Sequence, residues 1–296
     1  MRRSTWRIHH GWFMTCVCLA WSTGSVERAA QAQSPSVKSL LAEVYFRATF
    51  DGGYEAKSTV GEAPILTAES TDRKEKRNGM TKSGVTIAKG EGKFGDCIRF
   101  SEKSKDVLFY PGTAMHYQTE DWSGTTSFWM RLNPDEDLKP GYCDPIQITQ
   151  KGWNDGSFFV DFDLTLPRDF RLGFFSGLKH WNPENIPWEK WPVDKRPMVT
   201  VKKPPFSRTH WTHVAFTYRD INSSKGQSSE AILYLDGKAQ GSLKQPMKVD
   251  WDLSQTAIMI GIDYIGDLDD LIVFRRVLSA DEIALLATTA LEPNAN

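Results

Sequence analysis

Short apolar runs separated by turn residues recur along most of the chain. Residues 125–132 and 211–218 are rich in β-branched and aromatic side chains. Residues 231–235 lead into the pair Asp236-Gly237, which is typical of a tight hairpin turn. Segments of this length and composition are typical of β-strands. The pattern therefore predicts an all-β chain of about a dozen short strands joined by turns.

The most strongly patterned stretch lies near the end of the chain. Residues 271–274 are continuously apolar, as expected for a strand that is covered on both faces. Ser279 and Glu282 follow at the spacing of a capping box, so the strand should pass directly into a short C-terminal helix. Three carboxylates crowd the beginning of this strand: Asp267, Asp269 and Asp270.

Residues 157–166 alternate between two kinds of side chain. The apolar positions are Phe158, Val160, Phe162, Leu164 and Leu166. The opposite side carries Asp161 and Asp163. This split with a period of two predicts that one face of the strand packs inward and that the other meets solvent or a ligand.

The alternation breaks in residues 178–206, which contain Trp181, Trp188 and Trp191 among many prolines. Proline removes a backbone hydrogen-bond donor, so this segment should not supply a central strand. It is also rich in aromatic residues, unlike disordered segments. We therefore expect a long ordered loop that lies over the sheets.

Several of these segments resemble a known family. Residues 266–279 read Gly-Asp-Leu-Asp-Asp-Leu-Ile-Val-Phe-Arg-Arg-Val-Leu-Ser, and residues 92–100 read Gly-Lys-Phe-Gly-Asp-Cys-Ile-Arg-Phe. Both resemble strands of the laminin-G-like, concanavalin A-like lectin/glucanase superfamily, as do residues 211–218 and 233–238. The resemblance implies a two-sheet antiparallel β-sandwich of the jelly-roll type with a short C-terminal helix.

The beginning of the chain has a different composition. It starts with the basic residues Arg2, Arg3 and Arg7, and residues 11–21 are apolar. A small-x-small cleavage site follows at Ala30-Gln31-Ala32. We interpret residues 1–32 as a signal peptide, 33–43 as an N-terminal linker and 44–290 as one LamG-like domain with an insertion at 178–206. The mature chain should then be secreted, in the periplasm or outside the cell, without membrane insertion. An uncleaved signal anchor is the alternative.

Composition and charge limit the partners. The chain has 296 residues, with 36 basic and 37 acidic side chains and a formal net charge of -1. This balance gives no electrostatic basis for binding nucleic acid or an anionic membrane surface. Cys97 and Cys143 remain after the predicted signal peptide, and a disulfide and two buried thiols are both compatible with an oxidising compartment.

Carboxylates beside a turn suit a hard cation, because calcium prefers several oxygen ligands. The resemblance implies a structural calcium held by Asp269, together with backbone oxygens near Asp51 and Gly95. The alternative is that the acids only cap the edge of the sheet and keep it soluble.

The resemblance and the tryptophans favour a non-catalytic, lectin-like function with a glycan or polysaccharide as partner. Sugar rings stack on aromatic planes, so the three tryptophans of 178–206 are the candidate platform. The face that carries Asp161 and Asp163 is the candidate surface beside it. The alternative is that the tryptophans fasten the loop onto the sheet.

Two further functions remain open. The first is an extracellular protein-interaction or adhesion module on the same fold. The second is a glycoside hydrolase or polysaccharide lyase with divergent carboxylates, because hydrolysis needs two carboxyl groups across the scissile bond. Asp161 and Asp163 are a weak candidate pair, and the Glu-x-Asp-x-x-Glu pattern of the superfamily's hydrolases is absent from the sequence.

Overall fold

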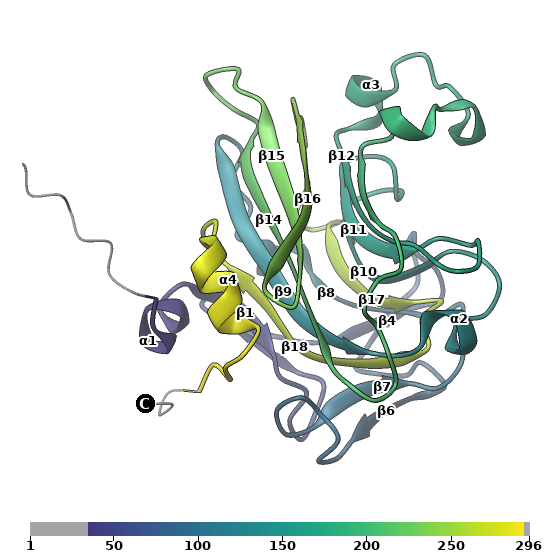
Figure 1. Ribbon diagram of the computed structural model, residues 1–296, viewed down its shortest axis with the longest axis vertical. Coiled ribbons are helices and arrows are strands. Elements are labelled where there is room, and N and C mark those ends of the chain that lie inside the picture. Colours follow the sequence, from purple (N-terminus) through teal and green to yellow (C-terminus); the bar gives the residue numbers. More distant parts are fainter. Residues whose placement is uncertain (1–34, 293–296) are drawn as a thin grey trace, which may run out of the picture. The chain divides into compact units, whose positions relative to one another are not determined.

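The computed structural model describes residues 35–292, whose strands form a sandwich of two antiparallel sheets (Figure 1). The predicted all-β sandwich is confirmed. No helix within this range is long and apolar enough to cross a membrane. The predicted signal peptide, residues 1–32, lies outside the described residues.

The first sheet contains ten strands. In hydrogen-bonded order they are β16 (Lys238–Gln245), β15 (Ser229–Leu235), β14 (Thr212–Ile221), β9 (Trp122–Arg131), β18 (Gly266–Phe274), β1 (Val44–Ala48), β2 (Ala56–Ser58) and β3 (Gly61–Ala63). Outside this path, β7 (Cys97–Phe100) pairs with β18, and β6 (Val85–Ala88) pairs with β7.

The second sheet contains eight strands. Their order is β13 (Met198–Val201), β12 (Phe170–Phe175), β11 (Ser157–Phe162), β10 (Cys143–Thr149), β17 (Ala257–Ile262), β8 (Val107–Pro111), β4 (Leu66–Ala68) and β5 (Lys76–Asn78). The helices are α1 (Val37–Leu41), η1 (Gly112–Met115), α2 (Pro134–Asp137), α3 (Leu178–Trp181), η2 (Trp188–Lys190), η3 (Val193–Lys195) and α4 (Ala280–Leu286).

The main core lies between the sheets and consists of alternate residues of each strand. Phe128 of β9 and Phe216 of β14 face inward from the first sheet. Phe158 and Phe174 face them from the second sheet and stack with their ring centroids 4.4 Å apart. Because the inward positions are apolar, the residues between them are free to build a different surface on the outer face.

Helices α1 and α4 pack on the outer face of the first sheet (Figure 1). Leu40 of α1 and Ile283 of α4 share a buried cluster with Ile272 and Phe274 of β18. The sequence predicts a linker at 33–43. In the structure this segment contains α1, and the side chain of Leu40 in that helix is fully buried. The predicted C-terminal helix is confirmed as α4.

Two segments contain more regular structure than the sequence indicates. Residues 54–83 are polar and charged in sequence, yet they contain β2, β3, β4 and β5. Each of these strands has only three residues, which is too short for an alternation to be recognised. The insertion 178–206 forms α3, η2 and η3 as an ordered loop, but its last part is β13, which pairs with β12 at the edge of the sheet.

Cys97 and Cys143, the two cysteines in the described part of the chain, are both free and buried. Burial raises the pKa of the Cys97 thiol to about 12. Of the two alternatives for these cysteines, the structure therefore shows two inert thiols rather than a disulfide.

The start of α4 is fixed by the predicted capping box. Ser279 Oγ accepts the backbone N–H of Glu282 at 3.2 Å, and Glu282 Oε2 accepts the backbone N–H of Ser279 at 2.8 Å. Arg276 Nη2 donates to the other carboxylate oxygen of Glu282 at 2.6 Å. These Arg276 hydrogen bonds are the main reason why the pKa of Glu282 is lowered to about 2.

Replacing Glu282 with Gln should lower the free energy of unfolding by about 1–2 kcal/mol, because one cap hydrogen bond and a charged partner of Arg276 are lost. The lowered pKa means that the wild type loses this contribution as the pH falls from 4.5 to about 2. Urea denaturation at neutral and acidic pH measures both effects. Glu43→Gln, which removes a carboxylate 3.3 Å from Arg276 outside the cap, is the matched control. Equal midpoints for the two variants would contradict the role of the cap.

Candidate functional site

A cleft of about 370 Å³ lies on the outer face of the second sheet. Phe159 and Asp161 of β11 line it, as does Arg171 of β12. Their neighbours along the strands, such as Val160 and Leu172, belong to the main core. The predicted split of this segment into an inward face and an open face is therefore confirmed within β11.

The alternation ends with β11, at Phe162. The sequence places Leu164 and Leu166 on the apolar side, but they lie in the loop beyond the strand and are 52% and 63% exposed. Asp163 is also in this loop, where its Oδ1 accepts the backbone N–H of Asp169 at 3.1 Å. Asp163 therefore borders a neighbouring hollow of about 480 Å³ rather than the cleft.

A β-bulge in β10 places two polar residues in the cleft. The pairing of β10 with β11 shifts between Cys143 and Ile146, which both belong to the main core. Asp144 and Gln147 line the cleft although they are three residues apart. On a regular strand, residues three apart point to opposite faces. The bulge is therefore what brings both side chains to the same face.

Aromatic side chains form one wall of the cleft. Trp153, in the turn between β10 and β11, meets Trp188 of η2 edge to face, with ring centroids 5.1 Å apart. Phe159 and Phe175 stack at 5.6 Å next to them. Phe159 crosses β12 at Gly173, where an added Cβ would lie 2.2 Å from the ring. Trp153 keeps 38% of its surface exposed, so part of its indole is open to a ligand.

Asp161 and Arg171 form a buried ion pair at the floor of the cleft. Arg171 Nε donates to Asp161 Oδ1 at 2.8 Å, and Arg171 Nη2 donates to Oδ2. Burial raises the pKa of Asp161, and the hydrogen bonds from Arg171 oppose that rise. The guanidinium also lies over the ring of Tyr142, 5.2 Å from its centroid. Both oxygens of Asp161 are therefore engaged.

Asp144 and Gln147 present polar groups that the rest of the described chain leaves without a partner. Gln147 is only 4% exposed, yet its side-chain amide makes no hydrogen bond within residues 35–292. Asp144 likewise makes no side-chain hydrogen bond or ion pair in this range. Burial raises the pKa of Asp144 well above its usual range, and the charge of Asp161 raises it further. The cleft therefore holds a carboxyl group without an ion-pair partner beside an open amide.

The three tryptophans of the insertion have different positions. Trp188 lines the cleft, with the guanidinium of Arg196 4.2 Å over its ring. Trp181 Nε1 donates to the backbone oxygen of Asn154 at 2.7 Å, and the ring packs against Trp191 at 5.3 Å. The structure thus brings Trp188 together with Asp161, whereas Trp181 and Trp191 fasten the insertion to its neighbours.

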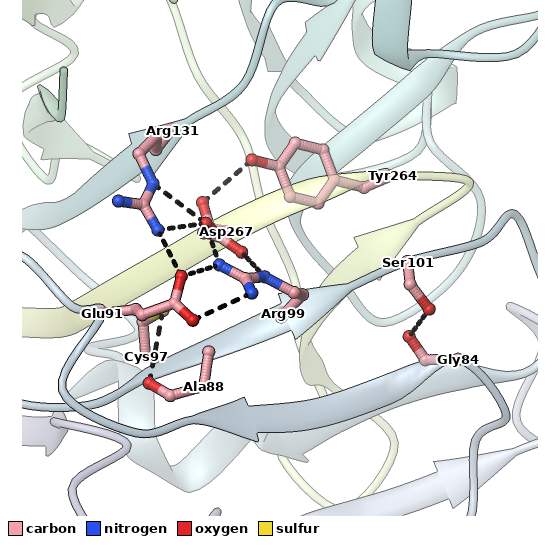
Figure 2. Close-up of polar contacts among 9 residues, drawn as sticks. All are labelled: Gly84, Ala88, Glu91, Cys97, Arg99, Ser101, Arg131, Tyr264 and Asp267. Carbon is pink, nitrogen blue, oxygen red and sulfur yellow. Dashed lines mark hydrogen bonds and ion pairs between the residues drawn. The ribbon is translucent and has the colours of Figure 1, made fainter. Parts of the chain in front are cut away.

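The predicted metal position lies elsewhere, at the beginning of β18, where three acids meet three different surroundings. Figure 2 shows Asp267 between the guanidinium groups of Arg99 and Arg131, which donate to its carboxylate with shortest distances of 2.7 Å each. Asp270 accepts from Arg47 Nε at 2.6 Å. These two carboxylates are therefore neutralised by arginine.

Asp269 has no such partner. Its Oδ2 accepts the backbone N–H of Phe94 at 3.0 Å, but its buried Oδ1 has no hydrogen bond within the described residues. Burial raises the pKa of Asp269 to about 8. Asp51 Oδ1 accepts the backbone N–H of Asp96 at 2.8 Å and lies where a Cβ on Gly95 would be only 2.2 Å away. The turn at 92–96 thus touches both Asp51 and Asp269.

This arrangement fits a cation only in part. The open Oδ1 of Asp269 is an oxygen ligand without a donor, and the neighbouring turn offers backbone carbonyls such as that of Gly95. Within residues 35–292, however, no group of three or more His, Cys, Asp or Glu side chains is arranged to hold a metal ion. A cation here would depend on Asp269 and on backbone oxygens.

Residues 113–284 match the Laminin G-type family model that is described as the concanavalin A-like lectin/glucanases superfamily. The match covers more than half of the chain. This chain belongs to that superfamily. A search of curated proteins with this sequence finds no significant match.

Solved structures share the concanavalin A-like fold. The binding domain of botulinum neurotoxin DC, in complex with SialylT, is 12% identical with a TM-score of 0.52, over 85% of this chain and 52% of that one. The same domain with rat synaptotagmin II is 12% identical with a TM-score of 0.54, over 86% and 53%. Domain 4 of AbnA, an extracellular arabinanase from Geobacillus stearothermophilus, is 14% identical with a TM-score of 0.47, over 83% and 100%. This chain spans about half the length of the neurotoxin domains, and the similarity concerns the fold alone.

Several residues of the cleft were not identified from the sequence. Arg171 faces Asp161 across the β11–β12 hairpin, so the register of that hairpin is a signal that could have found it. Trp153 lies in a short turn, where no periodicity reveals the direction of a side chain. Asp144 and Gln147 were missed because the bulge in β10 disrupts the alternation.

The buried ion pair gives a test of the cleft's construction. Arg171→Met should lower the free energy of unfolding by about 3–5 kcal/mol at neutral pH, because it leaves Asp161 buried without its partner. The double variant Asp161→Asn/Arg171→Met should recover most of this loss, because no buried charge remains. Urea denaturation followed by tryptophan fluorescence measures both variants. Simple addition of the two single losses in the double variant would contradict the coupling.

Proposed function

We propose that this protein is a secreted, non-catalytic carbohydrate-binding protein whose glycan lies in the cleft on the outer face of the second sheet. The observation that carries the proposal is the combination in one cleft of an open indole surface with polar groups that have no protein partner. Trp153 and Trp188 supply the aromatic surface, and Gln147 and Asp144 supply the polar groups.

The chemistry of a sugar suits this combination. The C–H face of a pyranose packs on an aromatic plane, while its hydroxyl groups need hydrogen-bond partners at the ring edge. Gln147 can both donate and accept, and the carboxyl group of Asp144 can accept in either protonation state. Polar groups that a ligand covers need partners in that ligand, so a ligand that satisfies Gln147 and Asp144 gains affinity and selectivity.

The comparisons are compatible with this proposal at the level of the fold. A botulinum neurotoxin binding domain of similar fold was solved with SialylT. For the type C neurotoxin, cell entry depends on interaction with two ganglioside molecules. At such low identity, and with this chain covering only about half of each neurotoxin domain, these proteins support the shared fold alone.

The cleavage alternative is less well supported by the geometry. Both oxygens of Asp161 are held by Arg171, so this carboxylate is not free to act as a nucleophile or base. Asp163 lies outside the cleft and is bound to the backbone of Asp169. We therefore favour binding over hydrolysis.

A specific observation favours a protein partner as the second candidate. Leu166 and Val193 are exposed large apolar residues that line the hollow bordering the cleft, and Val193 is 75% exposed. Exposed apolar side chains that gather in one place are typical of protein-interaction surfaces. A protein partner in this position fits the alternative of an adhesion module.

We also propose that a structural calcium binds at Asp269, with backbone oxygens of the turn near Gly95 and with Asp51 beside it. The support is the buried Oδ1 of Asp269, which has no donor among the described residues. A divalent cation there would stabilise the ionised carboxylate and join β18 to the turn before β7.

Removing the indoles of the cleft should separate binding from packing. A microarray of defined oligosaccharides first identifies a bound glycan. Trp153→Ala and Trp188→Ala should then each weaken its affinity at least about tenfold by isothermal titration calorimetry. Trp181→Ala is the matched control, because its indole is engaged with Asn154 and it should change the melting temperature more than the affinity. Unchanged affinity in both cleft variants would reject this cleft as the glycan site.

Calcium should raise the melting temperature in a manner that depends on pH. Because the pKa of Asp269 is raised to about 8, its contribution to stability in metal-free protein is lost as the pH rises from 3.8 through about 8. Calcium should therefore stabilise the metal-stripped protein strongly above pH 8 and little near pH 5. Asp269→Asn should abolish the response, and Asp250→Asn, at an exposed acid that lines a separate hollow, should preserve it. An unchanged melting temperature with calcium at high pH would reject the site.

A further inference from the structure

We propose that the ligand of the cleft carries a free amino group, so that the glycan is an amino sugar polymer or oligomer of the glucosamine type whose ammonium pairs with Asp144. This inference rests on the proposed carbohydrate-binding function and names the class of sugar. Three features of the cleft support it: the balance of its charges, the position of Asp144 and Gln147, and the aromatic wall beside them.

The charges of the cleft leave an excess of acid. The ionisable side chains along it are Asp144, Asp161, Glu189, Asp263, Lys151 and Arg171. Arg171 neutralises Asp161, and Asp263 is 3.0 Å from Lys103. Lys151 is 3.5 Å from Asp155. Asp144 and Glu189 are the two that form no ion pair in the described part of the chain. The cleft is therefore complementary to a cationic ligand and unfavourable for uronic or sulfated sugars.

Asp144 is positioned to receive a cation at the floor of the cleft. The β-bulge turns its carboxyl group outward beside the ion pair of Asp161 and Arg171. Asp144 has no side-chain partner of its own, and the almost fully buried amide of Gln147 lies on the same face, also without a partner among residues 35–292. An ammonium against Asp144 and a neighbouring hydroxyl against Gln147 would satisfy both groups at once.

The aromatic wall suits the same ligand. The face of an aromatic ring attracts a cation through its quadrupole, and it also packs against the C–H face of a sugar. Trp153 and Trp188 stand over this floor at right angles to each other. An amino sugar offers both properties in one ring, whereas a neutral sugar would leave the excess acid without a partner.

Binding of such a ligand has a proton balance that can be measured. Burial raises the pKa of Asp144 well above its usual range, and a ligand ammonium beside the carboxyl group would lower it again. The groups that face Asp144 are Asp161 on β11, Arg171 on β12, Asp263 after β17, and Tyr142, Lys151 and Glu189 around the rim. When the ligand's ammonium pairs with Asp144, any carboxyl group that still carries its proton loses it to the buffer. The ligand keeps its own proton, so binding should release protons, at most one per ligand bound.

The experiment compares three probes of equal length by isothermal titration calorimetry: β-1,4-linked glucosamine, N-acetylglucosamine and glucose oligomers. It uses the full-length protein at mildly acidic pH. Physiological ionic strength screens nonspecific attraction between the ligand and surface charges. The glucosamine oligomer should bind at least about tenfold more tightly than the other two. Titration in buffers of different ionisation enthalpy should show net proton release for glucosamine alone.

Asp144→Asn keeps the size of the side chain and imitates its protonated form. This variant should bind the glucosamine oligomer no more tightly than the glucose oligomer and should release no proton. Asp250→Asn, which removes an exposed acid outside the cleft, should retain the wild-type preference. Matching thermal unfolding of the two variants shows that each is folded.

Equal or tighter binding of the N-acetylated oligomer, or a preference that survives in Asp144→Asn, would overturn the inference. Binding of the glucose oligomer alone would overturn it as well, while leaving the proposed carbohydrate-binding function in place. Failure of all three probes to bind would also reject the inference. The oligosaccharide array then decides separately whether the proposed function fails with it.

Discussion

The burial of β18 is the constraint on which the rest of the structure depends. Every residue of this strand after Gly266 is buried, and the strand hydrogen-bonds to β9, β1 and β7. A strand in this position cannot carry free charges at its start without compensation. Arginines from three other strands therefore converge on Asp267 and Asp270, which joins distant parts of the chain around the last strand.

The packing around β18 also determines which face of the sandwich is open to a ligand. The outer face of the first sheet is occupied by α1 and α4, which pack on β18. The insertion 178–206 lies instead beside the outer face of the second sheet. A cleft remains between Trp188 of this insertion and the strands. The same alternation that fills the core with Phe158 and Phe174 gives Phe159 and Arg171 to that cleft. The core and the cleft therefore both result from the alternation of side chains between the two faces of these strands.

The sequence predicts the fold far better than the site. Two-residue alternation, the terminal strand and the capping box depend on local patterns, and the structure confirms the last two and the alternation as far as Phe162. The residues that line the cleft depend on the pairing register of neighbouring strands and on the conformation of loops. Asp161 was placed on the open face correctly, whereas Asp144 could not be, because a bulge changes which face a residue meets without changing composition. Trp153 and the short strands β2 to β5 were missed for a similar reason, since neither has enough residues for a period.

The central claim is that the ligand meets the indoles of the second sheet's cleft. The most direct measurement is the set of tryptophan indole N–H signals in two-dimensional NMR, recorded as a bound oligosaccharide is added. The account predicts that the signals of Trp153 and Trp188 shift with the ligand, while the signal of the core residue Trp122 stays in place. Unchanged signals from Trp153 and Trp188 at saturation, with shifts confined to tryptophans elsewhere, would contradict it.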